Sequence, residues 1–121
     1  MSDLATTVQA LRPFVPARDF DLCKRFYADL GFVMGFANDE LAVFSVGAAS
    51  FYLQNYCWEG VDQHYMLTLT VTDVEAWWPT ARDVAERYGV RVREPRDEAW
   101  GAREIHLIDP TGVLWHFAQF R

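Results

Sequence analysis

Apolar and polar residues follow one pattern that occurs twice along the 121-residue chain. In each half, a short strand pattern leads to an aspartate, Asp19 or Asp73, that is placed to cap a helix. Apolar residues then recur at three- and four-residue spacing until a glycine, Gly31 or Gly89, ends the helical pattern. Three short runs rich in β-branched and aromatic residues follow each helix. The sequence therefore predicts two βαβββ modules.

The predicted strands are separated by turn signals. We expect strands at 8–16, 32–37, 41–46 and 49–56, and again at 65–72, 90–94, 103–108 and 113–119. A loop is expected at 57–63, and Asp109-Pro110-Thr111-Gly112 should form the turn between the last two strands. Pro79 predicts a kink or a late start in the second helix, because proline removes a helix hydrogen bond.

Neither module can bury both faces of its sheet alone, so we expect one domain over residues 1–121. The two modules, at about 8–57 and 64–121, should share a core in an α+β fold. In that fold they pair into a cupped mixed sheet with the helices on the outside.

Strand phase divides the side chains of the predicted sheets between two faces. The more apolar face should pack on the helices; in strand 65–72 it carries Leu67, Leu69 and Val71. The other face is mixed and contains no lysine, a composition typical of a ligand cavity with a few directional polar groups. A dimer interface or a hydrated surface would also fit. Its members are Tyr52, Gln54, Tyr56, Met66, Thr68, Thr70, Glu104, His106 and His116.

Charge and composition narrow the partners. Asp and Glu number 17 against 11 Lys and Arg, and this net charge of −6 disfavours nucleic acid, whose phosphates require basic side chains. No stretch has the ~20 apolar residues of a membrane span, and residues 1–10 lack the features of a signal peptide. Cys23 and Cys57 have no zinc-ligand or CxxC spacing. We expect free thiols in a cytoplasmic protein that binds neither nucleic acid nor membrane.

Several motifs carry a family resemblance. The segments Phe26-Tyr27-Ala28-Asp29-Leu30-Gly31-Phe32, Ala99-Trp100-Gly101-Ala102-Arg103-Glu104, Asp109-Pro110-Thr111-Gly112 and Trp115-His116-Phe117 resemble the bleomycin resistance proteins. That group belongs to the glyoxalase/extradiol dioxygenase (vicinal oxygen chelate) superfamily, and the resemblance covers about residues 8–120. It implies paired βαβββ modules, a homodimer, and a ligand held in the cup or in a groove at the dimer interface. It also implies an antibiotic-resistance protein that sequesters a cationic drug without chemistry.

The resemblance also suggests individual site residues. Trp100 matches an aromatic of the family's groove, Phe36 falls where the family has another, and Thr68 replaces an aromatic found in some drug binders. The superfamily's enzymes carry their metal ligands at or near four positions that this chain fills with Arg12, Gln54, Met66 and His116. Arginine cannot ligate a metal and a thioether suits hard ions poorly, so two usable ligands remain where a catalytic metal takes three.

We therefore predict a non-catalytic small-molecule-binding protein with an aromatic or cationic ligand and no catalytic residue, metal or cofactor. The alternative is a metal-dependent enzyme of the same superfamily: a glyoxalase-type lyase, a ring-cleaving dioxygenase or a thiol transferase.

By strand phase, Glu104, His106 and His116 share a face and could form a non-haem iron triad, if the turn before the last strand keeps that phase. His116 could also serve as a metal-free acid or base. A purely structural or regulatory role is a third possibility. The predicted ligand-binding residues are Phe36, Tyr52, Gln54, Tyr56, Thr68, Trp100, His106 and His116.

Overall fold

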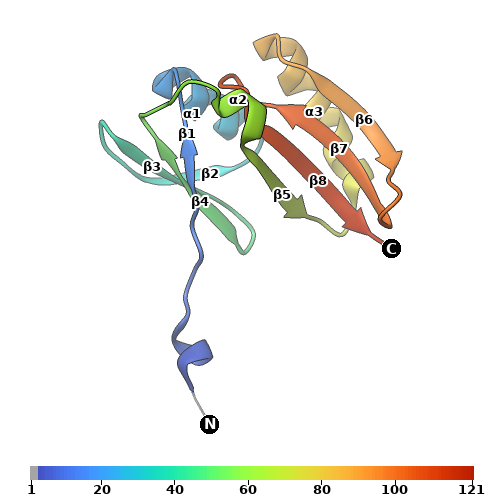
Figure 1. Ribbon diagram of the computed structural model, residues 1–121, viewed down its shortest axis with the longest axis horizontal. Coiled ribbons are helices and arrows are strands. Elements are labelled where there is room, and N and C mark those ends of the chain that lie inside the picture. Colours follow the sequence, from blue (N-terminus) through green and yellow to red (C-terminus); the bar gives the residue numbers. More distant parts are fainter. Residues whose placement is uncertain (1–2) are drawn as a thin grey trace.

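Each half of the chain forms a four-stranded mixed sheet with a helix packed on one side (Figure 1). This computed structural model describes residues 3–121. The first module contains β1 (Phe14–Pro16), α1 (Phe20–Asp29), β2 (Val33–Ala37), β3 (Leu41–Val46) and β4 (Ala49–Gln54). Its strand order is β1-β4-β3-β2, with β1 parallel to β4 and the other pairs antiparallel.

The second module repeats this arrangement. It contains β5 (Met66–Thr70), α3 (Val74–Tyr88), β6 (Val92–Asp97), β7 (Ala102–Ile108) and β8 (Leu114–Phe120), in the order β5-β8-β7-β6. Here β5 is parallel to β8 and the other pairs are antiparallel. The prediction of two βαβββ modules in an α+β fold is confirmed.

Both main helices begin where the sequence predicts. The Asp19 carboxylate accepts a hydrogen bond from the Leu22 amide (3.1 Å), and Asp73 accepts one from the Ala76 amide (3.3 Å). The helix α3 starts at Val74 and continues through Pro79, so the late start that the proline suggested is wrong. Pro79 lies in the second turn of α3, where tertiary packing outweighs the loss of one amide donor.

The first predicted strand is much shorter than expected. Only Phe14–Pro16 pairs with β4, while Leu4–Thr7 form a 3₁₀-helix (η1) and 8–13 belong to no strand. Pro13 still accepts a hydrogen bond from the Tyr52 amide, but proline has no N–H to extend the ladder. Residues 3–13 therefore form an arm that projects from the body (Figure 1).

Other boundaries differ less. The expected loop at 57–63 ends in a short helix, α2 (Val61–His64). No helix in residues 3–121 has the length and apolar composition needed to cross a lipid bilayer.

One continuous core joins the two modules on the helix-packed sides of their sheets. Phe51 of β4 and Trp115 of β8 meet with ring centroids 5.5 Å apart, and Tyr27 of α1 lies against both rings. The Tyr27 hydroxyl donates to the buried Asp109 carboxylate (2.5 Å) and accepts from the Trp115 indole N–H (2.8 Å). The β7–β8 turn of the second module is thereby bonded to the helix of the first.

Asp109 organises that turn from inside. Its Oδ1 accepts three backbone N–H bonds, each 2.9 Å long, from Thr111, Gly112 and Val113. Burial raises the pKa of Asp109, and these hydrogen bonds together with the one from Tyr27 oppose that rise. The turn also fixes the register of the β7–β8 hairpin, and with it the candidate site.

Candidate functional site

The helix-free face of the second sheet brings together one carboxylate and two imidazoles. The β7–β8 register is continuous and pairs His106 with His116 and Glu104 with Ala118. Residues two apart on a strand point to the same side, so Glu104, His106 and His116 project from one face. On the parallel neighbour β5, Thr68 is paired with His116.

Glu104 is the centre of this group. Its Oε1 lies 2.9 Å from His106 Nε2 and 3.0 Å from His116 Nδ1, and its Oε2 accepts a hydrogen bond from the Trp100 indole N–H (2.9 Å). The Glu104 side chain is almost fully buried although it carries a charge (3% exposed as a residue). We refer to Trp100, Glu104, His106 and His116 as the Glu104 cluster.

Hydrogen bonding keeps the buried carboxylate ionised. Burial alone would raise the pKa of Glu104, but the hydrogen bonds from His106, His116 and Trp100 outweigh it, so the pKa is lowered. The neighbouring Arg93 does not pair with this carboxylate. Its Nη2 donates to the Glu98 carboxylate (2.5 Å) and to the backbone oxygen of Glu104 (2.9 Å).

The contacts assign the imidazole tautomers. An ionised carboxylate only accepts, so the ring proton of neutral His106 is on Nε2 and that of neutral His116 is on Nδ1. His116 Nε2 then carries a lone pair, and this buried atom has no hydrogen-bond partner within residues 3–121. A buried polar atom without a partner is costly, so a donor group that reached this nitrogen would remove that cost.

The cluster has two chemical capabilities. Donor atoms of Glu104, His106 and His116 all lie within 4.8 Å of one another, close enough to hold a metal ion. His116 Nε2 can instead accept a hydrogen bond from a ligand, with Glu104 orienting the ring from behind. The Trp100 indole (61% exposed), held by the other oxygen of Glu104, offers a flat apolar surface.

Only half of the predicted ligand-binding residues lie in this part of the molecule. Thr68, His106 and His116 belong to the open face of the second sheet, and Trp100 lies in the β6–β7 loop next to it. The other four belong to the first module: Phe36 in β2, Tyr52 and Gln54 in β4, and Tyr56 just after β4.

The open face of the first sheet has a different character. Tyr52 packs against Phe14 with ring centroids 4.9 Å apart, and the Arg12 guanidinium lies 5.7 Å from the Tyr52 ring centroid. Arg12 also donates to the Ser50 hydroxyl (3.0 Å). Because the core sides of the two sheets face each other, their open sides are turned away from each other. One chain therefore does not gather all eight residues around a single cavity.

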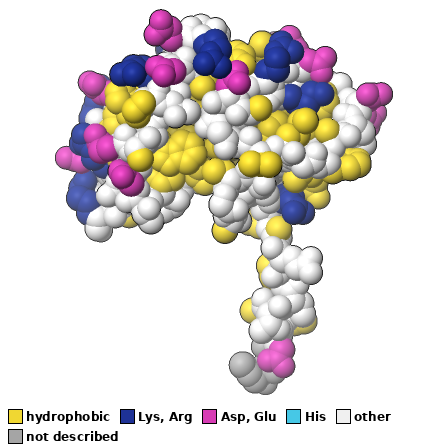
Figure 2. All heavy atoms as spheres, turned by 180° about the vertical axis from the view of Figure 1, so that it is seen from behind, with side chains coloured by type: hydrophobic (Ala, Val, Ile, Leu, Met, Phe, Trp, Pro, Cys, Tyr) yellow, Lys and Arg dark blue, Asp and Glu magenta, His cyan; other side chains and the backbone are white. Residues whose placement is uncertain are grey.

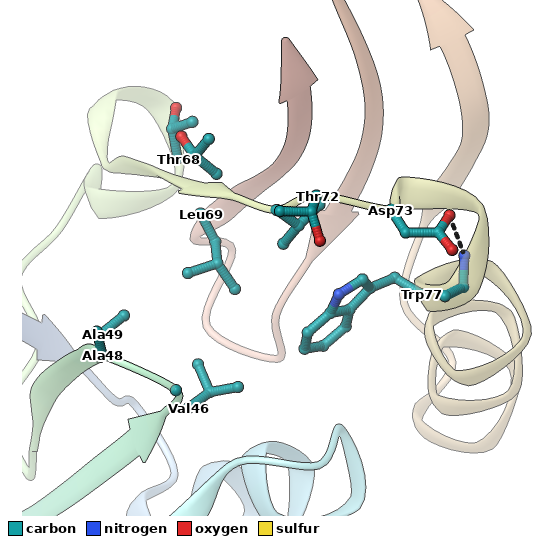
Figure 3. Close-up of a pocket in the computed structure, with 12 residues that line it drawn as sticks. Val46, Ala48, Ala49, Thr68, Leu69, Thr72, Asp73 and Trp77 are labelled. Atoms are coloured by element: carbon teal, nitrogen blue, oxygen red, sulfur yellow. Dashed lines mark hydrogen bonds between the residues drawn. The ribbon is translucent and has the colours of Figure 1, made fainter.

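A separate cleft of about 710 Å³ lies between the modules. It runs between the β3–β4 turn and the segment that joins β5 to α3, with the Trp77 ring on its wall (Figure 3). Hydrophobic side chains gather where the molecular surface is hollowed between the two lobes (Figure 2). Of the predicted ligand-binding residues, this cleft includes Thr68 alone. Trp77 lies on the apolar stripe of α3, so the sequence predicts a core residue at this position and gives no sign of a cleft.

Comparison with known proteins rests on structure, since no protein-family model and no curated sequence matches this chain. A bleomycin-binding protein complexed with bleomycin superposes with a TM-score of 0.80 at 23% identity, over 94% of this chain and 100% of that one. This chain has the glyoxalase/bleomycin-resistance fold.

Other proteins with that fold differ in what they do. A glyoxalase/bleomycin resistance protein from Catenulispora acidiphila matches with a TM-score of 0.72 at 26% identity, over 94% of this chain and 100% of that one. Lactoylglutathione lyase from Agrobacterium tumefaciens matches with a TM-score of 0.67 at 18% identity, over 93% of this chain and 94% of that one. The fold thus serves drug binding and catalysis alike, and function has to be argued from the side chains.

Proposed function

We propose that this protein is a non-catalytic small-molecule binder of the bleomycin-resistance type, with an aromatic or cationic ligand. The observation that carries the proposal is the unpartnered Nε2 of His116 in a cluster whose carboxylate, Glu104, also holds the exposed Trp100 indole. A ligand N–H or O–H would satisfy His116, while a flat ring would stack on Trp100.

The properties of Trp100 suit this role. Its N–H is already bonded to Glu104, so the ring is held in place before a ligand arrives and loses little freedom on binding. Stacking on such a ring contributes about 0.5–1.5 kcal/mol beyond the area buried. The net charge of −6 favours a cationic ligand over an anionic one.

A homodimer would complete the site. The two open faces of one chain point away from each other, so a second copy is needed to bring Tyr52 and Gln54 opposite His116. The arm before β1 also offers Val8 and Leu11, which are 70% and 88% exposed, as apolar contacts for a partner. We propose that the ligand lies in a cup or groove between two copies, in a reducing compartment such as the cytoplasm.

A metal-dependent enzyme is the second candidate, favoured by the spacing of Glu104, His106 and His116. It would resemble the lyase of the same fold in architecture. Two positions at which the superfamily's enzymes carry metal ligands argue against a metal-dependent enzyme. Arg12 is hydrogen-bonded to Ser50, and Met66 is exposed. The binder therefore accounts for more of the site.

Fluorescence titration tests the binder. Metal-free bleomycin and the planar cation proflavine are added to the protein in the presence of a chelator. We expect quenching by at least one probe, with affinity weakened about tenfold in Trp100→Leu, which removes the ring and corresponds to the upper end of one stacking contact. Trp58→Leu, at an exposed tryptophan beside the first sheet, is the matched control and should bind as the wild type does.

Absence of quenching by both probes, or equal losses in the two variants, would contradict the proposal. Light scattering of the eluting protein measures the oligomeric state separately. A dimer is expected, and a monomer at all concentrations would remove the cup between copies.

A further inference from the structure

We infer that Glu104, His106 and His116 form a binding site for one divalent transition-metal ion of the Zn²⁺ class. This goes beyond the proposed function, which requires no metal. It concerns donors on β7 and β8, of which only His116 is at a position that the resemblance implied for metal binding.

The donor atoms are already spaced for a shared metal. Glu104 Oε1 lies 2.9 Å from His106 Nε2 and 3.0 Å from His116 Nδ1. Two ligands bound to one tetrahedral Zn²⁺ at about 2.0–2.1 Å are separated by roughly 3.3 Å. The two Glu104 distances are slightly shorter than this and the two imidazole nitrogens lie within 4.8 Å of each other, so an ion could replace the two ring protons once the three side chains adjust around it.

The surroundings hold the donors in place. His106 and His116 are directly paired across an antiparallel ladder, so their backbones are fixed relative to each other. Trp100 binds the second oxygen of Glu104 and leaves the first one directed at both rings. Such outer hydrogen bonds to a ligating carboxylate are typical of protein metal sites.

Charge also favours a cation here. Glu104 is buried, and the partners of its carboxylate are two imidazoles and an indole, with no lysine or arginine among them. The guanidinium group of the nearby Arg93 forms an ion pair with the Glu98 carboxylate. A divalent ion would compensate a buried negative charge that hydrogen bonds alone offset at present.

Proton balance requires only a change of tautomer. When an ion binds His106 Nε2 and His116 Nδ1, each ring can carry its proton on the other nitrogen. His116 Nε2, the nitrogen without a partner, then carries the ring proton. Two imidazoles and one carboxylate select Zn²⁺, Ni²⁺, Cu²⁺ or Fe²⁺ over Mg²⁺ and Ca²⁺, which require mostly oxygen ligands.

Metal titration of the chelator-treated protein tests the inference. Calorimetry with Zn²⁺ and visible absorption with Co²⁺ should both give one ion per chain. His106→Ala, His116→Ala and Glu104→Gln should each weaken binding by more than about tenfold, because a ligand is lost. His64→Ala, at the exposed third histidine, is the control and should bind normally. No binding of either ion, or loss only in His64→Ala, would overturn the site.

A second measurement uses the wild type alone and does not depend on the folding of variants. Diethyl pyrocarbonate modifies imidazoles, and mass spectrometry locates the modified residues. Zn²⁺ should protect His106 and His116 and leave His64 reactive, and equal modification of all three with and without Zn²⁺ would contradict the inference. Probe binding in chelator is unaffected by this result, so the metal site and the binder can fail separately.

Discussion

Tyr52 and His116 occupy corresponding positions in the two sheets but have very different neighbours. Each lies on the strand that pairs with both a parallel and an antiparallel partner. Tyr52 stands between Phe14 and Val43, and His116 stands between Thr68 and His106. Tyr52 in the first sheet is thus surrounded by ring-stacking and apolar neighbours, while His116 in the second belongs to a hydrogen-bonded polar cluster.

The next position along each sheet shows the same contrast. Leu41 pairs with Gln54 in the first module, where Glu104 pairs with Ala118 in the second. The repeated topology places side chains at equivalent points, and their identity alone decides the chemistry. This division explains why the candidate site lies on one sheet.

The corresponding hairpin turns differ as much as the faces do. A Cβ added at Gly47 in the β3–β4 turn would meet no atom within 4 Å, whereas the β7–β8 turn is bonded to the core of the other module through Asp109. Substitutions in the two turns should therefore have unequal effects on stability.

The largest effect is expected for Asp109→Ala. It removes the acceptor of three backbone N–H bonds and of the Tyr27 hydroxyl, all inside the protein. We expect a loss of about 4 kcal/mol in the free energy of unfolding, since several buried donors lose their partner together. Urea denaturation measures it. Asp39→Ala in the exposed β2–β3 turn should change stability by less than about 0.5 kcal/mol, and similar losses in both variants would refute the anchoring role.

The next largest effect is expected for Gly112→Ala in the β7–β8 turn. Gly112 has φ 106°, and an added Cβ would lie 2.4 Å from the Asp62 Cβ and 3.2 Å from its Cα. We expect a loss of about 2–4 kcal/mol from strain and overlap combined. Gly47→Ala, at φ 55° with no atom nearby, should lose only about 1 kcal/mol. Thermal unfolding of both variants gives the comparison, and equal shifts would contradict the close approach of the turn to α2.

The reactivity of the two cysteines compares the protein interior at Cys23 with the loop at Cys57, and the measurement needs no substitution. Cys23 is fully buried against Thr111, and burial raises the pKa of its thiol to about 12. Because the thiolate is the reactive form, Cys23 should resist Ellman's reagent at pH 8 while the partly exposed Cys57 reacts. One fast thiol is expected in the native protein and two after unfolding. Two fast thiols in the native protein would show that the core opens readily.

The smallest effect is expected for an exposed hydrogen bond between the helices α1 and α3. The Tyr88 hydroxyl donates to the Asp29 carboxylate (2.5 Å), and this bond is the main cause that lowers the pKa of Asp29. A lowered pKa means that the stabilisation is present at neutral pH and is lost as the pH falls through the folded-state value. Tyr88→Phe should cost less than about 1 kcal/mol at pH 7, and the difference from wild type should vanish in acid. A difference that grows in acid would contradict this assignment.

Much of the fold could be predicted because its signals are local. Asp19 and Asp73 cap the helices, Gly31 and Gly89 follow them, and each pattern is contained within a few residues. The common face of Glu104, His106 and His116 also follows from strand phase, because the β7–β8 hairpin has no bulge. A register shift does occur between Arg93 and Arg96, on the other side of β7.

The remainder depended on contacts between distant segments. That the two open faces turn away from each other follows from the meeting of Phe51 with Trp115, which strand phase within either module cannot reveal. The sequence predicts that residues 8–13 belong to the first strand, but strand pairing begins only at Phe14, after a proline that has no amide donor. The partner atoms of Glu104, Trp100 included, likewise depend on how the β6–β7 loop folds back.

The central claim is that His116 Nε2 on the second sheet contacts a small molecule. It is tested most directly by magnetic resonance of protein labelled with ¹⁵N in its histidine rings, during titration with metal-free bleomycin or proflavine in chelator. We predict that the Nε2 resonance of His116 shifts in proportion to the bound fraction while the resonances of His64 do not move. Saturation of the protein with an unchanged His116 resonance would contradict the claim.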